Sequence, residues 1–328
     1  MNRFPAKTLL LVIFTLSCVL STQAWDETGH KLTGYIAWSR MTPDVRARVI
    51  KILLASPEDA QLSTFYASYG SRTLETRQRE FFMLVATWAD IVRDRNFAVR
   101  FQKYAHSNWH YSDTMWQVQN GKVVELPMPA DGGGLAVPQM IEFDKVARDP
   151  AVSDAQKAIA IAWLEHLIGD IHQPLHASAR VSDLEPKGDM GGNTFLLTPK
   201  DTPREKQENL HWFWDSIIVR AMPNTKDQCD ADYLDPIAQD IMKDYPFAKM
   251  QSRLDLGDFN GWRKESFEIA STKVFPPDLN RFEFPSDKYK KEALKISEER
   301  IALAGYRIGE LFNQIFGAPA AAVSTPAK

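Results

Sequence analysis

The sequence lacks several features, and each shortage excludes a class of protein. It contains no Gly-x-Ser-x-Gly motif, and its mature part has one cysteine, Cys229, in a polar segment, so no serine or cysteine nucleophile is indicated. The formal net charge of −3 gives no basic excess of the kind that marks a nucleic-acid-binding surface. Its one long apolar run, from Leu9 to Leu20, excludes a polytopic membrane protein. With 44% hydrophobic and 11% aromatic residues, the chain is not a disordered one.

Residues 1–24 have the pattern of a secretory signal peptide. Two positive side chains precede the apolar run, and small residues from Ser21 to Ala24 would suit a signal peptidase. The run is short of the about 20 residues that a transmembrane helix needs, although an uncleaved anchor is the alternative. Cleavage after Ala24 predicts a periplasmic or secreted protein. It would also leave Cys229 without an intramolecular partner, so that stability must come from packing or metal.

The remainder is predicted to form one mainly helical, all-α domain over residues 25–316, followed by a disordered tail over 317–328. The tail is rich in Ala, Pro, Ser and Thr. A short strand or hairpin is expected at Asn193–Leu197, because Gly191 and Gly192 precede it. Helical periodicity predicts helices at about 31–40, 44–54, 73–93, 135–147, 153–173, 205–221, 259–273 and 287–314.

The segment from Ser153 to His176 carries polar residues where none is expected. Its centre is apolar on every side, which predicts a fully buried helix, yet it contains His166 and Asp170 four residues apart on one face. A buried carboxylate needs a partner or a metal, because desolvation of its charge is costly. A buried His–Asp hydrogen bond is the simpler alternative. His172 lies on another side of this helix, where it would support the ligands or face solvent.

The same pattern recurs in three other apolar settings. His211 and Asp215 lie four residues apart among aromatic side chains, and Asp90 ends the apolar run from Phe81 to Trp88. His110 lies between two aromatic residues, in what the sequence suggests is a short extended segment. Each residue alone would more often be a satisfied core residue. Together, His and Asp at metal-ligand spacing favour a zinc site.

These motifs resemble those of the S1/P1 nuclease family, which comprises zinc-dependent nucleases and 3′-nucleotidases. The resemblance rests on Trp-x4-His after the cleavage site, Trp-Ala-Asp, His-Tyr-x-Asp, His-x3-Asp-x-His-Gln-Pro-Leu-His, Gly-Gly-Asn and Asn-Leu-His-x2-Trp-Asp, in this order. It implies a mainly helical domain of the phospholipase C/P1 nuclease type with a short β-hairpin. The missing disulfides suggest a bacterial-type member.

The resemblance implies three zinc ions per chain in one cleft. The first would bind Asp90, His110, His166 and Asp170. The second would bind the free amine and carbonyl of Trp25, together with His30 and Asp170, which requires cleavage after Ala24. The third would bind His176, His211 and Asp215.

The implied activity is endonucleolytic hydrolysis of single-stranded DNA and RNA to 5′-phosphate products by a metal-activated water, with 3′-nucleotidase activity. Arg93 stands where the family carries an arginine that contacts the phosphate, so Arg93 and Asp170 are the expected catalytic residues. Tyr111 and Asp113 stand where the family stacks and holds a base. A surface salt bridge for Arg93, core packing for Tyr111 and a solvated loop for Asp113 are the alternatives. A monomer without a stable protein partner is implied.

Two other functions compete with this interpretation. A zinc phospholipase C would share the N-terminal Trp and the His-x3-Asp-x5-His plan, although its ligand set tends to end with Glu rather than with a residue such as Asp215. A non-catalytic, zinc-stabilised binding protein would use the ions only to stabilise its fold. An open coordination position on zinc would separate an enzyme from such a protein. Asn193 is expected to support the site or to form a turn.

Overall fold

The computed structural model describes residues 25–68, 70–129 and 132–317. The predicted signal peptide and all but Gly317 of the predicted tail lie outside these ranges. Within them the fold is mainly helical, as predicted, with a single three-stranded sheet. No helix among the described residues is long and apolar enough to cross a membrane. The helices are α1 (Glu27–Arg40), α2 (Pro43–Leu54), α3 (Leu74–Val85), α4 (Trp88–Ile91), α5 (Ala98–Tyr104), α6 (Ala136–Arg148), α7 (Asp154–His172), α8 (Leu210–Asp215), α9 (Ile217–Ala221), α10 (Asp230–Asp244), α11 (Phe247–Met250), α12 (Phe259–Ile269) and α13 (Asp287–Phe316).

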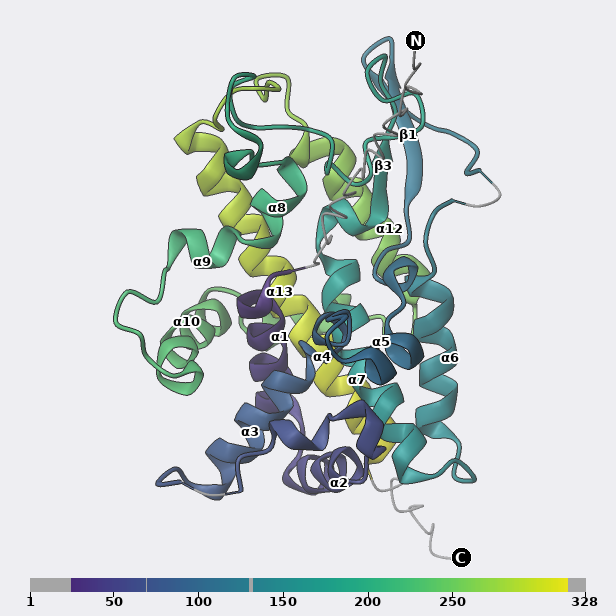
Figure 1. Cartoon of the computed structure of the whole chain (residues 1–328), viewed down its shortest axis with the longest axis vertical. Helices are drawn as coiled ribbons and strands as arrows, with labels where there is room; N and C mark the ends of the chain where they lie inside the picture. Colours follow the sequence, from purple (N-terminus) through teal and green to yellow (C-terminus); the bar gives the residue numbers. More distant parts are fainter. Residues whose placement is uncertain (1–24, 69, 130–131, 318–328) are drawn as a thin grey trace, which may run out of the picture.

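Helices α7 and α13 pass through the centre of the molecule, and the other helices surround them (Figure 1). The Ser153 hydroxyl caps α7 by accepting a hydrogen bond from the Gln156 amide, and Pro174 follows its end at His172. From Ala160 to His172 every residue of α7 is buried, which confirms the predicted fully buried helix. The helix that carries most of the polar anomalies is therefore the core of the fold.

Helices α1 and α13 cross at two glycines. A Cβ atom at Gly305 would lie 2.6 Å from Ile36 Cβ, and one at Gly309 would lie 2.7 Å from the Ala37 carbonyl oxygen. Glycine therefore permits a helix contact that any larger residue would push apart. This contact fixes α1, which carries His30, against the same central helix that packs on α7.

The sheet combines β1 (Thr114–Gln119), β2 (Lys122–Glu125) and β3 (Ser178–Arg180) in the order β2-β1-β3. A hairpin is present, but the predicted place is wrong. Strands β1 and β2 pair antiparallel around Asn120-Gly121, whose φ angles of 50° and 74° are typical of a type I′ turn. Segment 193–197 contributes only an isolated bridge between Leu196 and Asn209. Strand β3 pairs parallel to β1 and directly follows the 3₁₀ turn that contains His176.

Two predicted helices are interrupted. The segment 73–93 divides into α3 and α4, with a break at Ala86 and Thr87. The segment 205–221 contains α8 and α9, and α8 starts only at Leu210 because the Asn209 side chain caps it. Helices α5, α10 and α11 were not predicted.

A buried ion network joins α13 and α12 to the end of α7. Arg307 donates to His172 Nε2 at 2.8 Å and to both oxygens of Glu265, and Arg300 donates to Glu265 and to the His172 carbonyl oxygen. The other ring nitrogen of His172 donates to the Ile168 carbonyl oxygen. Burial and the two guanidinium groups hold the pKa of His172 well below its usual value, so the imidazole is neutral. His172 was predicted to support the ligands or to face solvent; it is instead fully buried, with Arg307 and the Ile168 carbonyl oxygen as its hydrogen-bond partners.

Candidate metal centre

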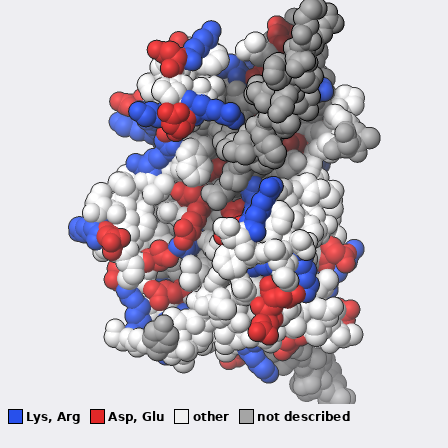
Figure 2. Space-filling model, viewed as in Figure 1, with Lys and Arg blue, Asp and Glu red and all other residues white. Residues whose placement is uncertain are grey.

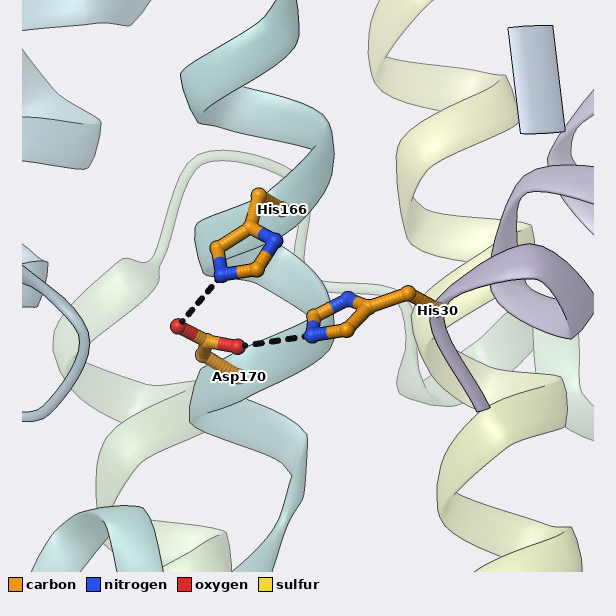
Figure 3. A group of neighbouring side chains, drawn as sticks. All are labelled: His30, His166 and Asp170. Atoms are coloured by element: carbon orange, nitrogen blue, oxygen red, sulfur yellow. Dashed lines mark ion pairs between the residues drawn. The ribbon is translucent and has the colours of Figure 1, made fainter. Parts of the chain in front are cut away.

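Asp170 lies at the centre of the site, between two imidazoles from different helices. His166 Nε2 is 3.3 Å from Asp170 Oδ2, and His30 Nε2 of α1 is 3.2 Å from Asp170 Oδ1 (Figure 3). All three side chains are fully buried. The two imidazoles stack, with ring centres 4.0 Å apart and planes 15° apart. Their donor atoms lie close enough to one another to hold a single metal ion.

A second group of donor atoms lies on the other side of His166. It combines His166 with Asp90 of α4 and with His110, which follows the 3₁₀ turn Ser107–Trp109. His110 Nδ1 is 3.0 Å from His166 Nε2, 3.1 Å from Asp170 Oδ2 and 3.9 Å from Asp90 Oδ1. The Asp170 carboxylate thus faces both groups, one oxygen toward each. His110 adopts a helical conformation rather than the extended one that the sequence suggested.

The third group comprises His176, His211 and Asp215. His211 and Asp215 lie on one face of α8, with Nε2 3.4 Å from Oδ2, and His176 Nε2 is 4.0 Å from Asp215 Oδ1. The side-chain amide of Gln173 donates to Asp215 Oδ1 at 2.6 Å. Sequence reasoning missed this role for Gln173, although its place in the His-Gln-Pro motif was a usable signal.

Main-chain carbonyl groups fix the orientation of three of these imidazoles. The Nδ1 atoms of His166, His176 and His211 lie 2.6–2.7 Å from the carbonyl oxygens of Ala86, His110 and Gly191, in that order. Donation of Nδ1–H to a carbonyl leaves the lone pair on Nε2, and this is how metal-binding histidines are usually held. The Ala86 carbonyl oxygen is available because the helix is interrupted between α3 and α4.

Several nitrogen and oxygen atoms of the three groups have no hydrogen-bond partner among the described residues. His30 Nε2, His110 Nε2, His176 Nε2 and Asp170 Oδ1 are buried and have no hydrogen-bond partner among the described residues. Burial, together with neighbouring carboxylates including Asp26, raises the pKa of Asp215 well above its usual value. Burial and the adjacent His166 lower the pKa of His30 to about 4. Buried imidazole nitrogens and carboxylate oxygens that lack partners fit a divalent cation.

Trp25 is fully buried at the start of the described chain, beside the third group. The Asp26 amide donates to the Asp215 carbonyl oxygen at 3.0 Å, which ties this end of the chain to α8. A Cβ atom at Gly29 would lie 2.8 Å from Trp25 Cβ, so the indole packs closely on α1. These contacts place Trp25 near the ligand groups, and its role as a ligand stays a prediction.

A cleft of about 340 Å³ opens onto the second and third groups. His110, His176 and His211 line it together with Tyr111 and Asp113. Burial and the nearby Asp189 raise the pKa of Asp113 well above its usual value, against the opposing charge of Arg263.

Arg93 contacts the Asp90 carboxylate, with Nη1 and Oδ1 3.3 Å apart, and its side chain is largely buried. The structure thus places Arg93 beside a predicted ligand rather than on the surface. Asn193 forms a turn in which its amide donates to the Met190 carbonyl oxygen, and it also lines the cleft.

Comparison with known proteins returns nucleases. A family model described as S1/P1 Nuclease matches residues 25–317. Endonuclease 1 from Arabidopsis thaliana is 25% identical over 94% of this chain and 92% of its own length. Nuclease S1 from Aspergillus oryzae is 23% identical over 93% and 96%, respectively. Endonuclease 5 from Arabidopsis thaliana is 27% identical, but the match spans about half of each protein, 48% of this chain and 51% of the relative.

Proposed function

Because the chain belongs to the S1/P1 nuclease family and is thus a hydrolase of phosphodiester bonds, we propose that it is a zinc-dependent endonuclease acting on single-stranded DNA and RNA. It leaves 5′-phosphate products and also removes phosphate from 3′-nucleotides. The observation that carries the proposal is the presence of three groups of buried His and Asp donors beside one cleft.

Each group would hold one zinc ion. Imidazole nitrogens and carboxylate oxygens suit zinc, and a site with three protein ligands leaves a fourth position open. The first ion would be held by Asp90, His110, His166 and Asp170, and the third by His176, His211 and Asp215. The second would be held by His30 and Asp170 with the amine and carbonyl of Trp25. Bound zinc would supply a Lewis acid for the phosphate and a water of lowered pKa.

The protein's own residues orient the substrate. Arg93 donates its guanidinium hydrogens to a non-bridging phosphate oxygen, and its contact with Asp90 holds it beside the second ligand group. Tyr111 stacks on a base, which accepts any base and favours unpaired strands. The raised pKa of Asp113 favours its protonated form, which can donate a hydrogen bond to the base edge as well as accept one.

The proposal includes export. Residues 1–24 would be removed as a signal peptide, and the mature protein would act in the periplasm or the medium as a monomer. Cleavage after Ala24 is a chemical requirement of the second site, because only then does Trp25 have a free amine. N-terminal sequencing of the secreted protein tests this step directly, with Trp25 as the expected first residue.

The central experiment measures zinc and turnover on the secreted protein. We expect about three zinc ions per chain and hydrolysis of single-stranded DNA, RNA and a 3′-mononucleotide. Asp170→Asn should lose zinc and more than about 10³-fold in kcat/KM, more than the loss of one transition-state donor. Asp201→Asn, at an exposed position, is the matched control.

The rival functions predict other results. Three zinc ions with turnover of phosphatidylcholine and none of nucleic acid would replace the nuclease by a phospholipase C. Bound zinc without turnover of nucleic acid or phosphatidylcholine would indicate ions that only stabilise the fold. The match of the family model to residues 25–317 favours the nuclease over both.

A further inference from the structure

The cleft has two walls that come from different parts of the chain. Residues from Ser107 to Asp113 form one wall, and residues from Lys187 to Asn193 form the other. His176 and His211 also line the cleft. The second wall belongs to the loop between β3 and α8, and Lys187 in it lies outside the quoted family motifs. The loop therefore meets whatever part of a substrate extends beyond the metal groups.

Lys187 is the only cationic side chain among the described residues that line this cleft. It is exposed, and it forms no ion pair with the part of the chain that the structure describes. Some lysines have partners: Lys103 lies 2.6 Å from Asp59, and Lys290 lies 3.2 Å from Asp287. Figure 2 shows acidic and basic side chains interspersed over one face of the molecule. Other exposed lysines, Lys51 among them, also form no ion pair with the described residues, so Lys187 is distinguished by its position at the cleft.

The acidic residues nearest to Lys187 in sequence are already engaged. The Glu185 carboxylate pairs with Arg281 and accepts from Ser182 and Thr194. Asp189 Oδ1 accepts from the Arg180 amide at 2.9 Å. Asp189 Oδ2 is buried without a hydrogen-bond partner among the described residues, but it forms no ion pair with Lys187, which is exposed. The Lys187 ammonium group is therefore open to an anion from solution.

The loop that presents Lys187 is anchored by main-chain hydrogen bonds directly after this residue. The Asp189 amide donates to the Arg180 carbonyl oxygen at 2.9 Å, and the Thr194 amide donates to the Asp189 carbonyl oxygen at 3.2 Å. Gly188 has a φ angle of 93°, and a Cβ atom there would lie 3.2 Å from Ala179 Cβ. Glycine thus allows the loop to lie directly on β3. Because the backbone is fixed, only side-chain freedom is lost when the ammonium group binds a ligand.

We propose that Lys187 binds a phosphate of the substrate strand other than the one that is cleaved, and so selects polynucleotides over 3′-mononucleotides. The proposal rests on the proposed nuclease function and deepens it. A mononucleotide carries one phosphate, which the metal groups and Arg93 engage, and offers nothing to a cation farther along the cleft. A strand offers further phosphates, and an exposed lysine accepts each of them as a point charge without regard to sequence.

The experiment compares two substrates in the zinc-loaded, secreted protein. Lys187→Ala should lower kcat/KM for a single-stranded oligonucleotide about tenfold more than it lowers kcat/KM for a 3′-mononucleotide. Lys187→Arg should restore most of the difference, because it keeps the charge. Lys51→Ala, at an exposed position on α2 and remote from the sheet in Figure 1, is the matched control and should leave the ratio unchanged.

A substrate variant tests the same contact from the other side. When methylphosphonates neutralise the linkages that flank the cleaved one, the wild-type protein and Lys187→Ala should have equal kcat/KM. Binding provides a readout independent of turnover, with a labelled oligonucleotide whose linkages have a methylene group in place of the 3′ oxygen and resist hydrolysis. Loss of one phosphate contact should reduce the slope of log affinity against log salt by about 0.7.

The outcomes separate the inference from the function beneath it. Equal losses on both substrates, or an unchanged salt slope, would overturn the role of Lys187 and leave the nuclease intact. Binding that depends on Lys187 without hydrolysis of either substrate would overturn the nuclease and leave the phosphate contact standing. A wild-type protein that neither binds nor cleaves the oligonucleotide would overturn both.

Discussion

The last turns of α7 carry buried polar residues on two sides, and the two sides are satisfied differently. On one side His166 and Asp170 face other His and Asp side chains, and several donor atoms there have no hydrogen-bond partner among the described residues. On the other side both ring nitrogens of His172 are engaged, by Arg307 and by the Ile168 carbonyl oxygen. The same helix thus presents an incomplete polar cluster and a complete one.

This difference distinguishes a ligand from a structural histidine. A buried polar group costs free energy unless it is paired, so an incomplete cluster points to a partner outside the chain. The complete cluster needs no such partner, because Glu265 and main-chain oxygen atoms accept hydrogen bonds from the guanidinium groups of Arg300 and Arg307. Sequence position does not separate the two, since His172 lies only two residues from Asp170. We therefore expect perturbations on the two sides to affect different quantities.

The largest effect should come from removing metal, which acts on the incomplete side alone. A chelator should abolish nuclease activity, and the free energy of unfolding should fall by about 4 kcal/mol for each ion that was held at a thousand times its dissociation constant. Calorimetry and turnover before and after chelation measure both quantities. Zinc should restore both, and activity that survives complete removal of metal would contradict the assignment.

The next effect concerns the complete side. Glu265→Gln should lower the free energy of unfolding by about 3 kcal/mol, because it leaves two buried guanidinium groups without their counter-charge. Zinc content should be unchanged, and activity below the melting temperature should change only a few-fold. Asp144→Asn, which removes a surface partner of Arg148, is the control and should cost at most about 1 kcal/mol. Loss of zinc in Glu265→Gln would show that the two sides are not independent.

The pH dependence of that variant has a definite sign. Burial alone would raise the pKa of Glu265, but Arg307 and Arg300 outweigh it and hold the pKa below its usual value. The ionised carboxylate binds a proton less readily in the folded than in the unfolded protein. Its stabilisation is therefore present above the unfolded pKa and is lost as the pH falls through the folded pKa. The difference in the free energy of unfolding between wild type and Glu265→Gln should therefore shrink as the pH falls.

The smallest effect tests geometry on the ligand side. A Cβ atom at Gly169 would lie 2.9 Å from His30 Nδ1, so Gly169→Ala should displace His30 and reduce zinc binding about 10–100-fold, as loss of an outer-shell contact does. Gly261→Ala is the matched variant, because its Cβ atom would meet the Asp258 side chain at the start of α12 and no proposed ligand. Both should be destabilised, but only Gly169→Ala should lose zinc in titrations. Equal zinc affinity in both would refute the distinction.

The sequence predicted well where local and global signals agree. Ser153, the apolar run and Pro174 bound α7 correctly, and His166 and Asp170 at i and i+4 indicated one face. The His and Asp residues named from the family resemblance lie in three clusters, although His166 belongs to two of them rather than to one. Spacing indicated the shared face within each motif, the grouping across motifs came from the resemblance, and metal binding by these groups stays a prediction.

The prediction failed where tertiary contacts decide. The helical periodicity over 73–93 continues through Ala86, yet the helix is interrupted there. The Ala86 carbonyl oxygen accepts a hydrogen bond from His166, 80 residues away in the sequence. The hairpin was placed after Gly191-Gly192, although Asn120-Gly121 is the stronger turn signal. Those two glycines serve the site instead, since a Cβ atom at Gly191 would lie 3.2 Å from His211 Nδ1. The role of Lys187 had no sequence signal, because it depends on a loop folding over β3.

The ligand groups draw on residues from His30 to Asp215, and this dispersal affects folding kinetics. Each ion would need ligands from segments far apart in the chain, such as α4 with α7, α1 with α7, or α8 with the turn after α7. Most of the binding free energy would therefore appear only after these segments have docked, late in folding. Stabilisation gained at that stage slows unfolding and leaves the folding rate nearly unchanged. We therefore expect zinc to lengthen the lifetime of the native protein many-fold, which would protect an exported enzyme from proteases through slow opening.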